Sequence, residues 1–387
     1  MIQSHDLFGL VLSQSDTHSA HDITHDSGDS LLQALHESQN LLQALHQSQT
    51  LGQEYLINDN GQVAPVVGHS SSSGHTTGPI TQTAATPPPT VVVGAGGFKI
   101  NLIWDSSVTS APDPSGFMQA VKDAAQYYAS QFSNNEIVNI NVGYGEIAGG
   151  ALSAGALGES ESYGYLTDYA TITNALAAKD GFTFAATNEP MNSLFAITSA
   201  EAKTLGIVPP ATSLDGYIGF NTLSGTGLSW NLAHTPTGQN TGTGLSQLDL
   251  QSAALHEISE VLGRIGIQGT ASVYDANNNP IPIYTPLDLF NFAGTGTLAL
   301  SPSGGYFSTD NGHTNLGWFN NNAANGGDIA DWASDTSPFQ AGTHGLPTGP
   351  NVTDAFAAFA YLGANGDIST SDLQEMAALG YTLKHQV

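Results

Sequence analysis

Three consecutive segments between residues 98 and 144 constrain the fold most strongly. Residues 98–104 (FKINLIW) and 137–144 (IVNINVGY) show the alternation of apolar side chains that is typical of β-strands. Between them, residues 116–132 place apolar side chains at helical spacing. A strand, a helix and a second strand in this order favour a mixed sheet covered by helices. We therefore predict an α+β fold with a mixed, mostly parallel, twisted sheet.

The sequence after residue 144 continues this pattern. We expect an edge strand or a flexible rim at 148–165 and a strand at 216–220. Helices are expected at 169–178, 248–262 and 370–379. A chain of 387 residues is long enough to bury a sizeable core around these elements.

Residues 1–96 differ in composition from the rest of the chain. They contain no Lys or Arg and 8 of the 13 His, and they end in a run rich in Ser, Thr, Gly and Pro. Such a composition favours a mostly disordered leader and linker over 1–96, followed by one globular domain over 97–387. Within the leader, 31–40 is nearly repeated by 41–50, which suits an amphipathic helix. The leader's His residues are candidates for a metal site, with solvated positions as the favoured interpretation: His18, His21, His25, His36 and His46.

The charge balance excludes several classes of partner. The formal net charge is -27, so neither nucleic acid nor an anionic membrane is an expected partner. The absence of Cys excludes disulfides and thiolate metal sites. The sequence has no run of 18 apolar residues and no recognisable N-terminal signal peptide. We nevertheless expect a secreted protein, because the composition is acidic, free of Cys and very poor in Lys and Arg. We also expect it to be a monomer.

The segment 255–266, LHEISEVLGRIG, has the clearest chemical signature. His256 and Glu260 are four residues apart, so on a helix they project from one face and can bind one ion, with Glu257 beside it. An imidazole and a carboxylate can hold zinc, which acidifies water, while an adjacent glutamate accepts the proton. The flanking residues are apolar, which makes a solvated helix face with a chance His the weaker alternative.

Seven stretches within residues 97–384 resemble a family of bacterial extracellular metalloproteases related to the metzincins, but with HExxE in place of HExxH. The stretches are FKINLIWD, NINVGYGEI, LHEISEVLGR, YTPLDLFNFAG, YFSTDNGHTNLGWFN, GDIADWAS and DLQEMAALGY. HEISEVLGR and TPLDLF are the most specific. The resemblance implies a metzincin-like protease domain around a central active-site helix. It also implies His256 and Glu260 as zinc ligands and Glu257 as the general base.

The chain departs from the metzincin pattern at the third ligand. Gly266 stands where a metzincin has His or Asp, and no Met occurs between Met191 and Met376 to form a Met-turn. We expect the third ligand to be Asp288 in TPLDLF, because a carboxylate in an apolar block needs a partner. Two rivals are Asp310 and His313. For each Asp, the structural alternative is a cap or a turn.

Two neighbouring residues are assigned to substrate binding or to support of the ligands: Arg264 and Tyr284. Arg264 either offsets the negative charge of a His, Glu and Asp shell or pairs with one of its carboxylates. Zn²⁺ is the expected metal, with manganese or iron as alternatives because the ligands are hard. Ca²⁺ is a second candidate ion for Asp328, Asp331 and Asp335, although solvated turns are the favoured interpretation.

Two functional hypotheses follow. The first is a secreted metal-dependent endopeptidase in which Glu257 activates water and a strand near 151–163 holds the extended protein or peptide substrate. The second is a non-catalytic extracellular binding or matrix protein on a metalloprotease-like scaffold. The two differ in one geometric respect, because a scaffold need not gather three protein donors around one ion.

Overall fold

The computed structural model describes residues 54–59, 61–66, 89–184, 193–234, 246–275, 277–302, 305–320, 327–333 and 353–385. All of them fall in one compact unit, Leu41–Val387. The repeat at 31–50, most of the leader and Asp335 lie outside the described residues. In the described part, no helix is both long and apolar enough to cross a membrane.

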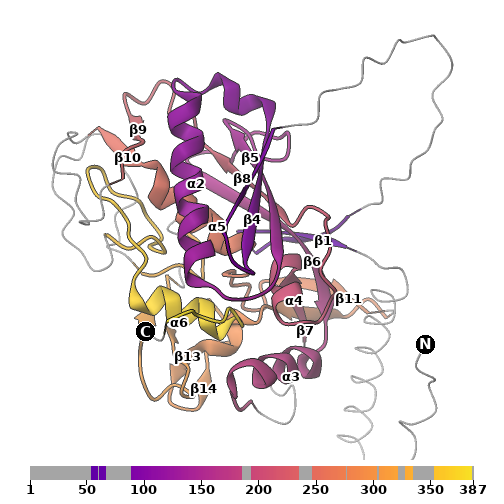
Figure 1. Ribbon diagram of the computed structural model, residues 1–387. Coiled ribbons are helices and arrows are strands. Elements are labelled where there is room, and N and C mark those ends of the chain that lie inside the picture. Colours follow the sequence, from indigo (N-terminus) through magenta and orange to yellow (C-terminus); the bar gives the residue numbers. More distant parts are fainter. Residues whose placement is uncertain are drawn as a thin grey trace, which may run out of the picture. The chain divides into compact units, whose positions relative to one another are not determined.

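A ten-stranded sheet organises this unit (Figure 1), and its main path runs β11-β12-β7-β6-β8-β5-β4-β3. Its strands are β1 (Tyr55–Asn58), β2 (Val63–Pro65), β3 (Thr90–Val93), β4 (Lys99–Trp104), β5 (Ile137–Tyr144), β6 (Gly158–Thr167), β7 (Leu194–Thr198), β8 (Gly216–Phe220), β11 (Ala271–Tyr274) and β12 (Pro280–Tyr284). Strands β4, β5 and β8 are parallel, whereas β6 runs antiparallel to β8. The predicted mixed sheet is confirmed, and its parallel pairings are β4 with β5, β5 with β8, and β7 with β12.

Five helices and two smaller sheets complete the described fold. The helices are α2 (Pro114–Gln131), α3 (Tyr169–Asp180), α4 (Ser199–Thr204), α5 (Leu250–Val261) and α6 (Thr370–Ala378), with 3-10 turns at η1 (Ser106–Ser110) and η2 (Leu287–Phe290). The smaller sheets contain β9 (Ser229–Asn231) with β10 (Gln247–Asp249), and β13 (Asn291–Gly294), β14 (Thr297–Leu298), β15 (Tyr306–Phe307) and β16 (Gly317–Trp318). The four helices predicted from periodicity are therefore present as α2, α3, α5 and α6.

Helix α2 supports the helix that carries the HExxE residues. It begins where the Asp113 side chain accepts a hydrogen bond from the backbone N–H of Gly116. Figure 1 shows α2 (purple) running along the parallel strands, with α5 (orange) behind it. The two helices are joined by a buried hydrogen bond of 2.7 Å from the Tyr128 hydroxyl to the carbonyl of Leu255. This bond holds α5 in place at Leu255, which is the residue before His256.

The described fold begins earlier than the boundary predicted at residue 97. Strand β1 pairs with β6, β2 pairs with β1, and β3 pairs with β4. Ile57 of β1 is 1% exposed, so this strand is part of a core. The correction has a simple cause: a four-residue strand inside a polar leader contributes too little to the composition to be recognised without its partner strand.

Glu136 makes the stability of the metal-free protein depend on pH. Burial raises its pKa to about 7, against the opposing effects of a hydrogen bond from Thr204 and the charge of Lys203. Because the folded state binds the proton more tightly, the stabilisation is complete below about pH 4.5 and is lost as the pH rises through 7. The loss is about 3 kcal/mol.

We expect Glu136→Gln to remove this part of the pH dependence, because glutamine does not ionise and still accepts the bond from Thr204. Urea unfolding at pH 5 and pH 8 measures it: the difference in unfolding free energy between the two pH values should shrink by about 2.5 kcal/mol in the variant. An unchanged difference would show that Glu136 is already ionised at pH 5 in the folded protein.

Candidate metal centre

Helix α5 is held at both ends, which fixes the direction of its functional side chains. At the start, the Asp249 carboxylate accepts a hydrogen bond of 2.8 Å from the backbone N–H of Ser252. At the end, Gly263 has a φ of +117°, and a Cβ there would lie 2.7 Å from a carboxylate oxygen of Glu201. Only glycine fits both conditions, so the helix ends there, as predicted.

Four side chains from two distant parts of the sequence converge on one point. His256 and Glu260 project from α5, and they meet Asp328 and Asp331 with all four donor atoms within 4.8 Å of one another. The Nε2 atom of His256 lies 3.2 Å from Glu260 Oε1 and 3.3 Å from Asp331 Oδ1. The predicted pair on the helix is therefore joined by two carboxylates from the segment after β16.

The orientation of the His256 ring suits metal binding. Its Nδ1 atom lies 2.8 Å from the carbonyl oxygen of Ala355, so Nδ1 carries the hydrogen and donates it to that oxygen. In the neutral ring, the lone pair is then on Nε2 and points at the carboxylates. This arrangement is the one that backbone carbonyls impose on metal-binding histidines.

Arg264 stands behind the carboxylates. Its Nη1 donates to Asp331 Oδ1 at 2.6 Å, and its Nη2 donates to Glu260 Oε1 at 3.2 Å. Its Nε bonds the Ser259 hydroxyl, and the guanidinium lies 4.5 Å from the ring centroid of Phe356. Because the side chain is 1% exposed and fully engaged, it positions the carboxylates and does not reach substrate.

The buried charge in the cluster is unbalanced. Burial and the neighbouring charges of Asp331 and Glu260 raise the pKa of Asp328 well above its usual range. Burial alone would lower the pKa of His256, but Asp331 and Glu260 raise it well above its usual value despite Arg264. Protons thus supply the positive charge that the cluster requires, and a divalent cation can replace them. The donor set fits such an ion.

Glu257 lies beside the cluster and faces strand β6. A Cβ at Gly158, the first residue of β6, would overlap Glu257 Oε1, so glycine is required for the two to approach. The Oε2 atom is buried and, among the described residues, has no hydrogen-bond partner. Burial and the charge of Glu260 raise the pKa of Glu257 well above its usual range. When it is ionised, a carboxylate with a vacant oxygen can accept a proton.

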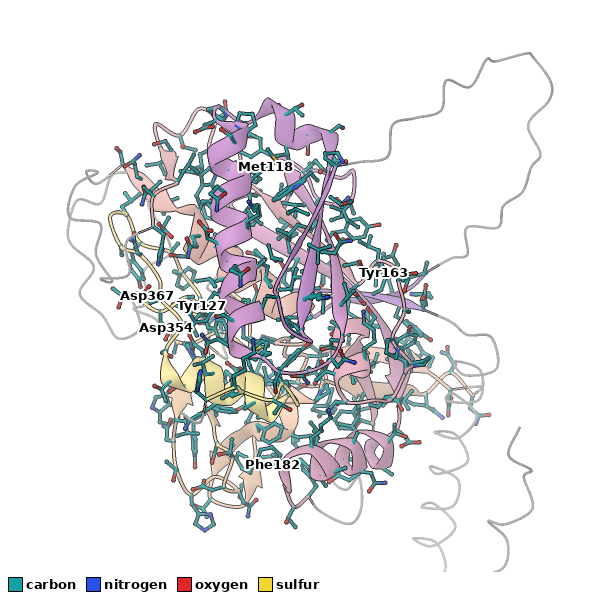
Figure 2. The ribbon with its side chains drawn as sticks, viewed as in Figure 1. Met118, Tyr127, Tyr163, Phe182, Asp354 and Asp367 are labelled. Atoms are coloured by element: carbon teal, nitrogen blue, oxygen red, sulfur yellow. The ribbon has the colours of Figure 1, made fainter. Side chains whose placement is uncertain are left out.

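A cavity of about 580 Å³ opens onto these residues. It is lined by the loop 153–159 that leads into β6 and by His256 and Glu257 of α5. Residues of the segment 354–366 also line it, and Asp354 of this segment pairs through a β-bridge with Asp367; Figure 2 labels both residues. The volume is in the range of sites that hold small ligands or a few residues of a peptide.

Asp288, the predicted third ligand, lies outside this cluster. Its Oδ2 atom accepts backbone hydrogen bonds from Ile267 (3.3 Å), Gln268 (2.9 Å) and Thr285 (2.8 Å). Burial raises its pKa to about 6, while the backbone bonds from Gln268, Thr285 and Ile267 lower it. The buried carboxylate does have partners, but they are backbone N–H groups: two in the loop after α5 and that of Thr285, directly after β12. The assignment of Asp288 is therefore corrected to a structural role.

The other predicted residues also have structural partners. Asp310 accepts hydrogen bonds from the backbone N–H and the hydroxyl of Thr314, and the exposed His313 bonds the carbonyl of Asp310. Tyr284 is 6% exposed, donates to the carbonyl of Leu300 at 3.2 Å, and does not line the cavity. Its assignment to the site is corrected, because β12 directs it into the core.

Asp331 and Asp328 are the donors that sequence reasoning did not assign to this centre. From the sequence they are candidates for a calcium site, with solvated turns as the favoured interpretation. The buried Trp332, whose Nε1 bonds the Asp372 carboxylate at 2.6 Å, holds this segment against the core. Two carboxylates three residues apart before a tryptophan were the available signal, since acidic residues in a buried segment need a charge partner.

Comparisons with known proteins give no family for this chain: no family model, no curated protein and no solved structure matches it. The resemblance to HExxE metalloproteases therefore stays a prediction.

Proposed function

We propose that this protein is a metal-dependent endopeptidase that acts outside the cell. The observation that carries the proposal is the convergence of His256, Glu260 and Asp331 on one point, with Glu257 beside it in the lining of a cavity. Zinc is the proposed metal, and a metzincin-like relationship is the proposed ancestry. The extracellular location rests on the acidic, Lys- and Arg-poor composition.

Each residue of the site has a separate role in the proposed reaction. His256, Glu260 and Asp331 would hold the ion, with Asp328 as a further oxygen donor. A divalent ion there would supply Lewis acidity, polarising a carbonyl and making water more acidic. Glu257 would take the proton from the attacking water and pass it to the leaving amine. Arg264 would keep two of the carboxylates in place through its bonds to Glu260 and Asp331.

Strand β6 would orient an extended substrate, although less of it is open than the sequence suggested. The strand begins at Gly158 rather than 151, and its residues 158–162 pair with β8. On its other side, residues 161–164 pair with β1. The part next to the cavity is the start of the strand at Gly158, where a peptide in extended form would lie beside Glu257.

The alternative of a non-catalytic scaffold is less well supported. A binding protein has no need for several donors on one point, a histidine oriented through Nδ1, and a buried glutamate with a vacant oxygen. We retain it only as the outcome of a negative activity test.

The test is proteolysis by the full chain loaded with Zn²⁺. We expect it to cut an unfolded protein substrate at internal peptide bonds, which mass spectrometry of the fragments identifies, and to stop when the metal is removed by a chelator. A folded, zinc-loaded protein that cleaves neither unfolded proteins nor a peptide library would refute the endopeptidase proposal.

A further inference from the structure

The hairpin formed by β1 and β2 brings a carboxylate to the metal centre. Strand β1 runs antiparallel to β6, with Asn58 opposite Glu161, and the chain turns at Asp59 before β2 returns. Figure 1 shows β1 lying next to β6 at the side of the sheet. The turn is closed by a 3.0 Å bond from the N–H of Gly61 to the carbonyl of Asn58. Asp59 is therefore at the tip of a defined hairpin, not in a free loop.

Apolar side chains anchor this hairpin. Ile57 is 1% exposed and Tyr55 is 9% exposed. Both pack in a core cluster shared with β6, β7, β12 and the loop after α5, whose members are Leu166, Leu194, Ala196, Ile265, Ile267, Ile281 and Ile283. Because these anchoring side chains are buried, Asp59, the residue that follows β1, is held in one position relative to α5.

Asp59 occupies the edge of β6 in the way that a bound strand would. Its N–H donates to the carbonyl of Ser160 at 3.3 Å, and its Oδ2 accepts from the N–H of Ser160 at 3.2 Å. The Ser160 hydroxyl in turn donates to Glu260 Oε2 at 2.9 Å. Along a strand, the backbone N–H and C=O groups of every second residue face the same edge. After Ser160, the next residue of β6 whose N–H and C=O face the edge occupied by Asp59 is therefore Gly158.

The carboxylate of Asp59 reaches the chemical centre itself. Donor oxygens of Asp59, Glu257 and Glu260 lie within 4.8 Å of one another, and Asp59 lines the cavity. Two donors bound to one ion at about 2.1 Å are separated by about 4 Å at most. A small movement of the Asp59 carboxylate would therefore let it contact an ion bound by Glu260. The contact would be on the side of the ion next to Glu257.

We propose that Asp59 is an internal inhibitor of this centre, whose carboxylate takes the place that a substrate carbonyl would occupy next to Glu257 and the ion. The inference rests on the proposed function for its effect on hydrolysis, but the contact between Asp59 and the ion does not require it. A peptide entering from the cavity along Gly158 has to displace this carboxylate, so the full chain is held in a low-activity state.

The experiment uses the full chain loaded with Co²⁺, whose visible absorption spectrum reports the donors around the ion. The variants are Asp59→Ala and Asp59→Asn, since asparagine can still accept the bond from Ser160 if alanine impairs folding. Glu54→Gln is the matched control, because it removes a carboxylate from the same hairpin outside the cluster. Three quantities are measured for each: the spectrum, the rate of Co²⁺ transfer to a chelator, and the rate of peptide hydrolysis.

We expect both Asp59 variants to change the spectrum, to lose Co²⁺ to the chelator about tenfold faster, and to hydrolyse peptides about tenfold faster, with Glu54→Gln unchanged. An unchanged spectrum and exchange rate would overturn the contact, and slower hydrolysis would overturn the inhibitory role. A changed spectrum with no hydrolysis by any variant would instead refute the endopeptidase and the inhibition while leaving the contact. Absence of bound Co²⁺ in the parent would overturn both proposals.

Discussion

Replacing Glu257 with glutamine is expected to lower peptide hydrolysis by about 10³-fold while the protein keeps its metal. Glutamine has nearly the same volume, so it fits against Gly158, where the close approach leaves no room for a larger group. It cannot accept a proton, so the step assigned to the buried, vacant oxygen of Glu257 is lost. Initial rates on a fluorogenic peptide, with metal content by elemental analysis, measure the two effects separately.

A control for this prediction lies on the neighbouring strand. Glu161→Gln changes a carboxylate of β6 that belongs to neither potential metal group and does not line the cavity. Its hydrolysis rate should stay within about twofold of the parent, as expected of a substitution that leaves the site intact. If Glu257→Gln kept its activity, Glu257 would be excluded as the general base.

The second large effect is on zinc affinity and concerns the third metal ligand. Substitutions of Asp331 and Asp288 are expected to have opposite results. Asp331→Asn keeps an oxygen that can accept the hydrogen bond from Arg264 but removes the charge that binds the ion. We expect zinc affinity to fall by more than about 100-fold in this variant. Mutation of a group that only hydrogen-bonds a metal ligand already lowers metal affinity by about 10- to 100-fold, and loss of a ligand should cost more. Competition with a chelator of known affinity measures the change.

Asp288→Ala is expected to keep its zinc and to lose stability. The substitution leaves three backbone N–H groups, those of Ile267, Gln268 and Thr285, without their acceptor. Each buried unsatisfied group costs about 1 to 3 kcal/mol, so unfolding free energy should fall by about 3 kcal/mol or more. Zinc bound normally by Asp331→Asn but lost from Asp288→Ala would reverse the assignment of the third ligand.

The periodic elements and the helical part of the site could be predicted from local sequence. The strand at residues 99–104, the helix of α2 and the helix of α5 follow from the spacing of apolar residues along a few turns or a few pleats. The relation of His256, Glu257 and Glu260 is equally local, because a helix fixes which residues share a face. Gly263 ended the helix at the predicted position, for a conformational reason contained in that residue.

Long-range contacts decided the rest. Asp288 and Asp331 are both acidic residues in apolar surroundings, and each had to find a partner when buried. The path of the chain decided the partner of each: Asp288 accepts a hydrogen bond from the backbone of the loop after α5, and Asp331 pairs with His256 and Arg264. Asp59 is a still clearer case, since a four-residue strand reached the centre only by pairing with β6. The sequence by itself therefore determined the helix that carries the chemistry, and the tertiary structure decided which distant carboxylates complete it, because a carboxylate's role is set by the groups that burial brings within bonding distance.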